Sequence, residues 1–288
     1  MLRLRALWGS LALAAAATML PAGAVAADPP PMRVVTLAPH LAELVCAVGA
    51  CERIVGVVRH SDHPPTLRQV TGIGDAHAVN LEKVLALRPE LVLAWDGGTP
   101  PATLARLRDL GLRVEAIGVQ RLDDIGMALL RVGALLGTED AACAAQARYD
   151  ERLGALRERY RNAEPIRVLY QLQADPVFTI NGQSPISAAL GVCGGINVFA
   201  DLPQLAAAVS REAVLQSDPQ AIVYGRQDDG AGIRRSWAGF SSLTAVRHDN
   251  LLAVNADTLA RASPRMVDGI SELCEALDDA RRRLSVAR

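Results

Sequence analysis

The chain has 288 residues, enough for one large or two small domains, and its 30 basic and 31 acidic residues give a net charge of −1. This balance leaves no basic surplus of the kind that binds nucleic acid or an anionic membrane surface, so neither is expected as a partner. Half of the residues are hydrophobic but only 3% are aromatic. The core must therefore be aliphatic, and each aromatic residue in a loop is a candidate ligand contact.

The first 26 residues have the three parts of a secretory signal peptide. Arg3 and Arg5 form a basic start, residues 11–20 are an apolar core, and Ala24-Val25-Ala26 is a small-x-small cleavage site. The apolar core is too short to span a membrane, and no cysteine follows the cleavage site to carry a lipid. We therefore predict a signal peptide over residues 1–26 and a soluble mature chain in the bacterial periplasm.

Strand and helix patterns alternate from the start of the mature chain. The strands are short apolar runs, and the helices place apolar residues at a 3.6-residue period. The predicted strands are residues 33–37, 54–58, 91–94 and 113–117, and the predicted helices are residues 41–48, 103–110 and a short one from Leu81 to the Arg88-Pro89 stop. Because strands that alternate with helices form parallel sheets, we predict an α/β lobe over residues 27–138.

A long helix separates this lobe from a second one. Residues 139–163 contain no proline and a single glycine, Gly154, and they predict a linking helix of about 36 Å. The alternation then resumes over residues 164–288, with strands at 167–172, 221–224 and 251–254 and helices at 185–190, from Glu212, and at 266–284. The predicted fold class is α/β, with two Rossmann-like lobes that contain parallel sheets and are joined by one long helix.

The carboxyl ends of the strands in the first lobe carry the candidate ligand contacts. Trp95 follows the strand at residues 91–94, and ligands of open α/β sheets bind outside the carboxyl ends of the strands. Four of the five histidines lie in predicted loops at this end: His40, His60, His63 and His77. His40 and His60 follow the first two strands, so we expect their side chains to meet. Because imidazole is the commonest metal ligand, we hypothesise that His60 approaches or ligates the metal of a bound tetrapyrrole.

Catalytic motifs are absent from the sequence. It contains no G-x-S-x-G, no H-E-x-x-H and no phosphate-binding loop. Asp62 and His63 could form an acid–base pair, but no third group accompanies them. We therefore expect a binding protein with no catalytic residues and no cofactor of its own, and an exported enzyme remains the alternative of a different class.

Six runs of residues resemble a known family over nearly the whole mature chain. They are Val34-Val35-Thr36-Leu37-Ala38-Pro39, Ser61-Asp62-His63-Pro64-Pro65, Asn80-Leu81-Glu82 through Trp95, Val192-Cys193-Gly194-Gly195-Ile196-Asn197-Val198-Phe199, Val209-Ser210-Arg211-Glu212 and Arg261-Ala262-Ser263-Pro264-Arg265. The sequence resembles the periplasmic vitamin B12 (cobalamin)-binding proteins of ABC importers, in the helical-backbone (class III) group of solute-binding proteins. The resemblance implies capture of cobalamin or a related corrinoid and its delivery to an inner-membrane ABC permease, and we expect a monomer. Haem, siderophores and metal chelates such as Ni–histidine are the alternative ligands, because their binding proteins share this architecture.

The resemblance also implies roles for single residues. Trp95 and Phe178 match aromatic positions that wall the corrin site, and Asp257 matches a site acid near the nucleotide end of the ligand. Glu82 and Glu212 match two acids, one in each lobe, that pair with arginines on the permease dimer.

The sequence departs from the family pattern at several positions of the site. His60 stands where the family has a tyrosine, and Ala76 and Ala206 stand where it has tryptophans. The aromatic wall is therefore thinner, and we expect a roomier or more polar pocket.

All five cysteines lie in the mature chain. The resemblance implies a disulfide between Cys193 and Cys274. Cys46 and Cys51 are close enough in sequence to pair, although the geometry of the helix at residues 41–48 could forbid it. Cys143 lies on the linking helix, where we expect a buried thiol.

Overall fold

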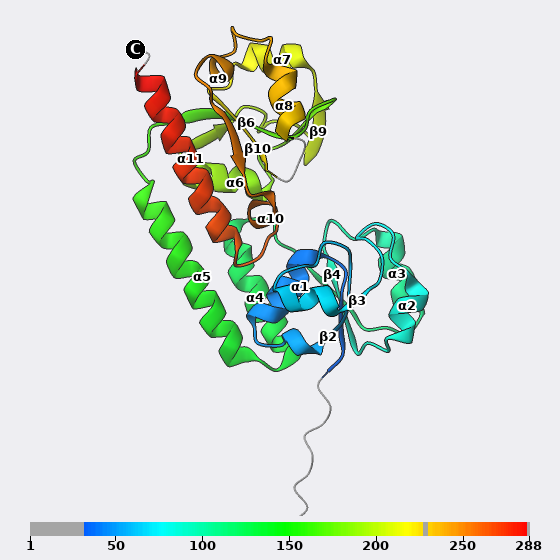
Figure 1. Cartoon of the computed structure of the whole chain (residues 1–288). Helices are drawn as coiled ribbons and strands as arrows, with labels where there is room; N and C mark the ends of the chain where they lie inside the picture. The colour runs from blue at the N-terminus through cyan, green and yellow to red at the C-terminus, as the bar shows by residue number, and fades with distance from the viewer. Residues whose placement is uncertain (1–31, 227–229, 287–288) are drawn as a thin grey trace, which may run out of the picture. The chain divides into compact units, whose positions relative to one another are not determined.

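The computed structural model describes residues 32–226 and 230–286, and Figure 1 shows their helices and strands along the chain. The predicted signal peptide lies outside the described residues. Among those residues, no helix combines the length and the apolar composition that crossing a lipid bilayer requires.

The N-terminal sheet is formed by five parallel strands in the order β3-β2-β1-β4-β5. The strands are β1 (Val34–Thr36), β2 (Ile54–Val57), β3 (Thr71–Gly72), β4 (Leu91–Trp95) and β5 (Val114–Ile117). The helices between them are α1 (Pro39–Ala47), η1 (Cys51–Arg53), η2 (Pro65–Gln69), α2 (Leu81–Ala86) and α3 (Pro101–Asp109). Val34 and Val35 of β1 and residues 91–94 of β4 are fully buried, as expected for central strands that are covered on both faces.

Two helices follow the first sheet, and the sequence patterns predicted only the second. α4 (Leu122–Leu136) ends at Gly137, which has a left-handed backbone with a φ of 65°, and α5 (Glu139–Arg159) begins after Thr138. A Cβ added to Gly133 of α4 would lie 2.3 Å from the Cβ of Ala142 in α5, so the two helices pack closely. α5 is the long helix that leads to the second sheet (Figure 1), and it has 21 residues.

The C-terminal sheet is mixed, which differs from the parallel sheet that we predicted. Its main path has the order β11-β10-β6-β7-β9, and β8 pairs with β6. The strands are β6 (Ile166–Gln173), β7 (Val177–Ile180), β8 (Gly195–Asn197), β9 (Ala206–Val209), β10 (Ala221–Gly225) and β11 (Leu251–Val254). β7 is antiparallel to both β6 and β9. The turn between β6 and β7 is too short for a crossover, so the two strands can only pair as a hairpin.

The helices of this region are α6 (Pro185–Val192), α7 (Arg211–Ser217), α8 (Gly230–Trp237), α9 (Thr244–Arg247), α10 (Ala256–Leu259) and α11 (Met266–Val286). One continuous cluster of buried apolar side chains includes residues of β1, α4, α5, β6 and α11. The α/β class is therefore confirmed, with two sheets that share a core through these helices.

The cysteines form two disulfides. Cys193 is joined to Cys274, as the resemblance implied, and Cys46 is joined to Cys51. The Cys46–Cys51 pair forms because α1 ends at Ala47 and the chain turns back through η1. Cys143 is free and exposed, so our prediction of a buried thiol was wrong. Ala142 and Ala145 lie on the buried face of α5. Cys143 comes between them in the sequence, but its side chain lies on the exposed face of the helix.

Candidate ligand-binding site

Trp95 occupies the carboxyl end of β4, where the strand leaves the core. The four preceding residues of β4 are fully buried, whereas Trp95 is half-buried. Its backbone N–H donates to Thr99 Oγ1 at 3.0 Å, and a Cβ on Gly98 would lie 1.8 Å from the indole atom Cε3. Only glycine at position 98 leaves room for the indole ring over the turn, so this turn fixes the ring at the edge of the sheet.

His40 contacts Trp95 from the start of α1. The two rings meet edge to face, with their centroids 5.4 Å apart. The imidazole is 7% exposed, and its Nε2 atom has no hydrogen-bond partner. Burial lowers the pKa of His40 to about 4; Glu43 opposes this shift and Arg261 adds to it. His40 is therefore a neutral ring at neutral pH, and it lies in a helix and not in the predicted loop.

Within the described residues, the other predicted histidines form no ring contact with His40 or Trp95. His60 is exposed, with a left-handed φ of 68°, in a turn closed by a 3.3 Å hydrogen bond from Ser61 N–H to Val58 O. His63 is half-buried, and burial, with Arg265 nearby, lowers its pKa. Within residues 32–226 and 230–286, no group of three His, Cys, Asp or Glu side chains is placed to hold a metal ion.

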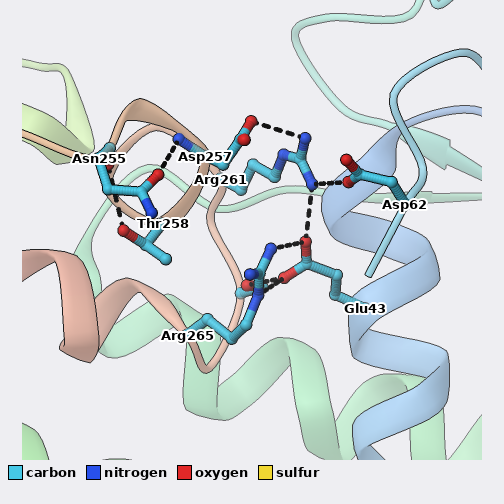
Figure 2. A network of polar contacts seen from close by, with 8 residues as sticks. Glu43, Asp62, Asn255, Asp257, Thr258, Arg261 and Arg265 are labelled. Atoms are coloured by element: carbon cyan, nitrogen blue, oxygen red, sulfur yellow. Dashed lines mark hydrogen bonds and ion pairs between the residues drawn. The ribbon is translucent and has the colours of Figure 1, made fainter. Parts of the chain in front are cut away.

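Asp257 belongs to a network of polar contacts, which Figure 2 shows. It lies in the first turn of α10, where its backbone N–H donates to the side chain of Asn255 at 3.0 Å. Its Oδ1 accepts a hydrogen bond of 2.8 Å from Arg261 Nη2. Arg261 Nη1 donates to Asp62 at 2.8 Å and to Glu43 at 3.2 Å. One guanidinium therefore connects acids of the first lobe with Asp257 of the second.

Glu43 is the buried centre of this network. Its side chain is 3% exposed. Arg265 donates to both carboxylate oxygens, from Nη2 at 2.6 Å and from Nε at 3.0 Å, and Ser263 Oγ donates at 2.5 Å. Burial acts to raise the pKa of Asp62, but Arg261 holds it below the usual range. The segment after α10 is therefore fastened to α1 by charge-assisted hydrogen bonds.

Glu43, Arg261 and Arg265 had no predicted role, and the two arginines were named only within one of the runs that resemble the family. One signal was present. Glu43 is the only charged residue in α1, and its neighbours on both sides, Leu41, Ala42, Leu44 and Val45, are all buried. An acid that must be buried with such neighbours requires a cationic partner.

Phe178 lies on β7, in the antiparallel part of the second sheet. It is half-buried and stands opposite Gln173 of β6 and Ala208 of β9. Ala206, at the start of β9, is exposed. Among the described residues, no ring contact joins Phe178 to Trp95 or to a histidine.

Glu82 and Glu212 occupy equivalent positions in the two lobes. Each lies in the first turn of a short helix that a neighbouring side chain caps: Asn80 accepts from Lys83 N–H at 2.9 Å, and Ser210 accepts from Ala213 N–H at 3.1 Å. Both glutamates are exposed, and neither forms an ion pair within the described part of the chain. The backbone N–H of Glu212 and the hydroxyl of Ser210 donate to the Glu212 carboxylate and lower its pKa.

The fold and this arrangement define a binding protein in which two α/β lobes are joined by a long helix. The chain belongs to the periplasmic binding protein family, whose profile matches residues 34–258. It is 34% identical over 256 residues to the vitamin B12-binding protein of Vibrio cholerae serotype O1, which covers 88% of this chain and 92% of the relative.

The crystal structure of the periplasmic vitamin B12 binding protein BtuF of Vibrio cholerae is similar to this structure, with a TM-score of 0.81 and 34% identity over 88% of this chain and 98% of that one. A periplasmic haem-binding protein from Pseudomonas aeruginosa is also similar, with a TM-score of 0.76 and 27% identity over 86% of this chain and 92% of that one.

Proposed function

We propose that this chain captures cobalamin or a closely related corrinoid and delivers it to an inner-membrane ABC permease. The observation that carries the proposal is the 34% identity to a vitamin B12-binding protein across 88% of the chain, which includes both lobes. The chain acts by binding alone, as a monomer and without a cofactor of its own. It leaves its ligand chemically unchanged, and nucleic acid is not a partner.

The geometry supports a flat ligand that carries polar groups. Trp95 is held between the Gly98 turn and His40, and a fixed indole ring packs favourably against a planar macrocycle. Phe178 supplies a second aromatic surface from the other lobe. Asp257, paired with Arg261, offers a charged and partly exposed polar group to the nucleotide end of the ligand. A site that is largely preformed in this way loses little binding free energy to ordering.

His60 is proposed to approach the metal of the bound corrinoid. Its left-handed φ of 68° is unfavourable for a residue with a Cβ, and glycine would fit this position of the turn better. Strained non-glycine residues cluster at functional sites. The same exposed imidazole supports the second candidate, a haem-binding protein, which the 27% identity to a haem-binding relative also favours.

Titration of the purified mature protein separates these candidates. Calorimetry with cyanocobalamin, dicyanocobinamide, haemin and Ni–histidine should give the tightest binding for a corrinoid. Tighter binding of haemin, or no corrinoid binding, would overturn the proposal. In visible absorption spectra, His60→Ala should change the bands of bound aquocobalamin, whereas His77→Ala, which alters another exposed loop histidine, serves as the matched control.

A further inference from the structure

Within the described residues, the side-chain carboxylate of Glu43 receives its hydrogen bonds from a segment that is far away in the sequence. It lies on α1, between β1 and β2, and its donors Arg261, Ser263 and Arg265 lie between α10 and α11. Figure 2 shows Arg261 and Arg265 converging on the Glu43 carboxylate. Ser263 donates to the same carboxylate, and the Glu43 side chain is 3% exposed. A buried carboxylate is retained only where such partners stabilise its charge.

The two arginines use Glu43 differently. Arg265 binds both carboxylate oxygens, a fork geometry that fixes the plane of the pair. Arg261 gives Glu43 only one nitrogen and gives its other terminal nitrogen to Asp257. The orientation of the Arg261 guanidinium therefore fixes the position of one hydrogen-bond donor to the Asp257 carboxylate.

Asp62 cannot replace Glu43 in this role. The Asp62 side chain is 42% exposed, whereas that of Glu43 is 3% exposed, and solvent screening makes an exposed ion pair weak. Asp62 also lies in the loop after β2, whereas Glu43 lies within α1. Without the charge of Glu43, Arg261 would keep two partly exposed acids and lose its buried carboxylate partner.

We propose that Glu43 is a positioning residue of the ligand site: it orients Arg261, and through Arg261 it orients Asp257, without contacting the ligand. This inference rests on the proposed function and adds to it a buried determinant of corrinoid affinity. Glu43 belongs to the first lobe and Asp257 to the second. The network therefore also links the polar groups that the two lobes contribute to the site.

A double-mutant cycle with cyanocobalamin tests this inference. Glu43→Gln and Arg261→Gln should each weaken binding by about ten-fold or more, the range expected for hydrogen bonds between charged groups. Because Glu43 acts through Arg261, the double variant should bind within about two-fold of Arg261→Gln alone. Losses that multiply would overturn the inference. Asp268→Asn, which removes an exposed acid that pairs with Arg152, is the matched control and should bind normally.

A second variant separates positioning from folding. Glu43→Gln leaves Arg265 partly buried without its partner, which can destabilise the chain, and Glu43→Gln/Arg265→Met removes that charge as well. We expect this variant to unfold at a higher urea concentration than Glu43→Gln and still to bind weakly. Recovery of normal affinity would show a structural role and overturn the inference. If the unaltered chain bound no corrinoid, the proposed function would fail first, and this inference would fail with it.

Discussion

His40 is buried beside Trp95 as a neutral imidazole, and this burial makes the stability of the fold depend on pH. Its pKa is about 4 in the folded chain and 6.5 in the unfolded chain. Above pH 6.5 both states are neutral at this position. Between pH 6.5 and 4 only the unfolded state takes up the proton, so the free energy of unfolding falls by about 3 kcal/mol across this window. Urea unfolding at several pH values measures this loss.

The variant His40→Gln isolates the contribution of this residue. It should be less stable than the original chain at pH 7.5, because the edge-to-face contact with Trp95 is lost. Its stability should nevertheless fall less steeply between pH 6.5 and 4. His77→Gln, at an exposed loop position, is the matched substitution. An equally steep fall in His40→Gln would assign the pH dependence to other groups.

Residue by residue, the sequence revealed side chains at strand ends more readily than those inside helices. The position of Trp95 at the end of a strand could be predicted, because a buried apolar run ends directly before it and a glycine turn follows. Glu43 could not be given a role, because its partners lie more than 200 residues away along the chain. A pattern of apolar residues shows which face of a helix is buried, but it does not show which distant cation neutralises an acid on that face.

The packing of α4 against α5 can be tested with two glycines of the same pair of helices. A Cβ at Gly133 would lie 2.3 Å from the Cβ of Ala142, whereas a Cβ at Gly154 would have nothing within 4 Å. Gly133→Ala should therefore destabilise the chain by about 1–3 kcal/mol, and Gly154→Ala should stabilise it by about 0.4–1 kcal/mol. Both changes improve helix propensity equally, so the difference between their unfolding midpoints measures the packing. Stabilisation by both would contradict this close approach.

At the scale of elements, local patterns located the buried strands but not every direction or every helix. β4 and β10 are continuous apolar runs, and both were predicted. α4 was missed because Gly126 and Gly133 weaken its helix signal. The role of its apolar residues becomes clear only from the tertiary structure, in which they pack against α5. The antiparallel course of β7 depends on the short turn after β6, and a single strand carries no sign of its direction.

Across the whole molecule, the two lobes repeat one local design. Asn80 and Ser210 cap short helices whose first turns present Glu82 and Glu212, and each helix leads through a proline to a central buried strand, β4 or β10. Both copies of this design can be read from the sequence, because caps and proline stops are local signals. The fastening of the lobes through Glu43 was not visible, because it depends on the tertiary fold.

This repeat makes the proposed docking of Glu82 and Glu212 on an ABC permease testable. Glu82 and Glu212 are exposed and form no ion pair within the described residues, so both charges are available to arginines of a partner. In the docking that we propose, these two acids face arginines of the permease, so Glu82→Lys/Glu212→Lys places like charges opposite them, which costs several kcal/mol. The double variant should lower cobalamin uptake by cells more than about ten-fold. Binding of cyanocobalamin by the purified variant should be unchanged, because the substitutions lie on the outer surface of helices that other residues cap.

Glu151→Lys, at an exposed acid of α5, is the matched control and should transport normally. A loss of ligand affinity in the double variant would instead assign these acids to the binding site, and normal uptake would remove them from the docking surface.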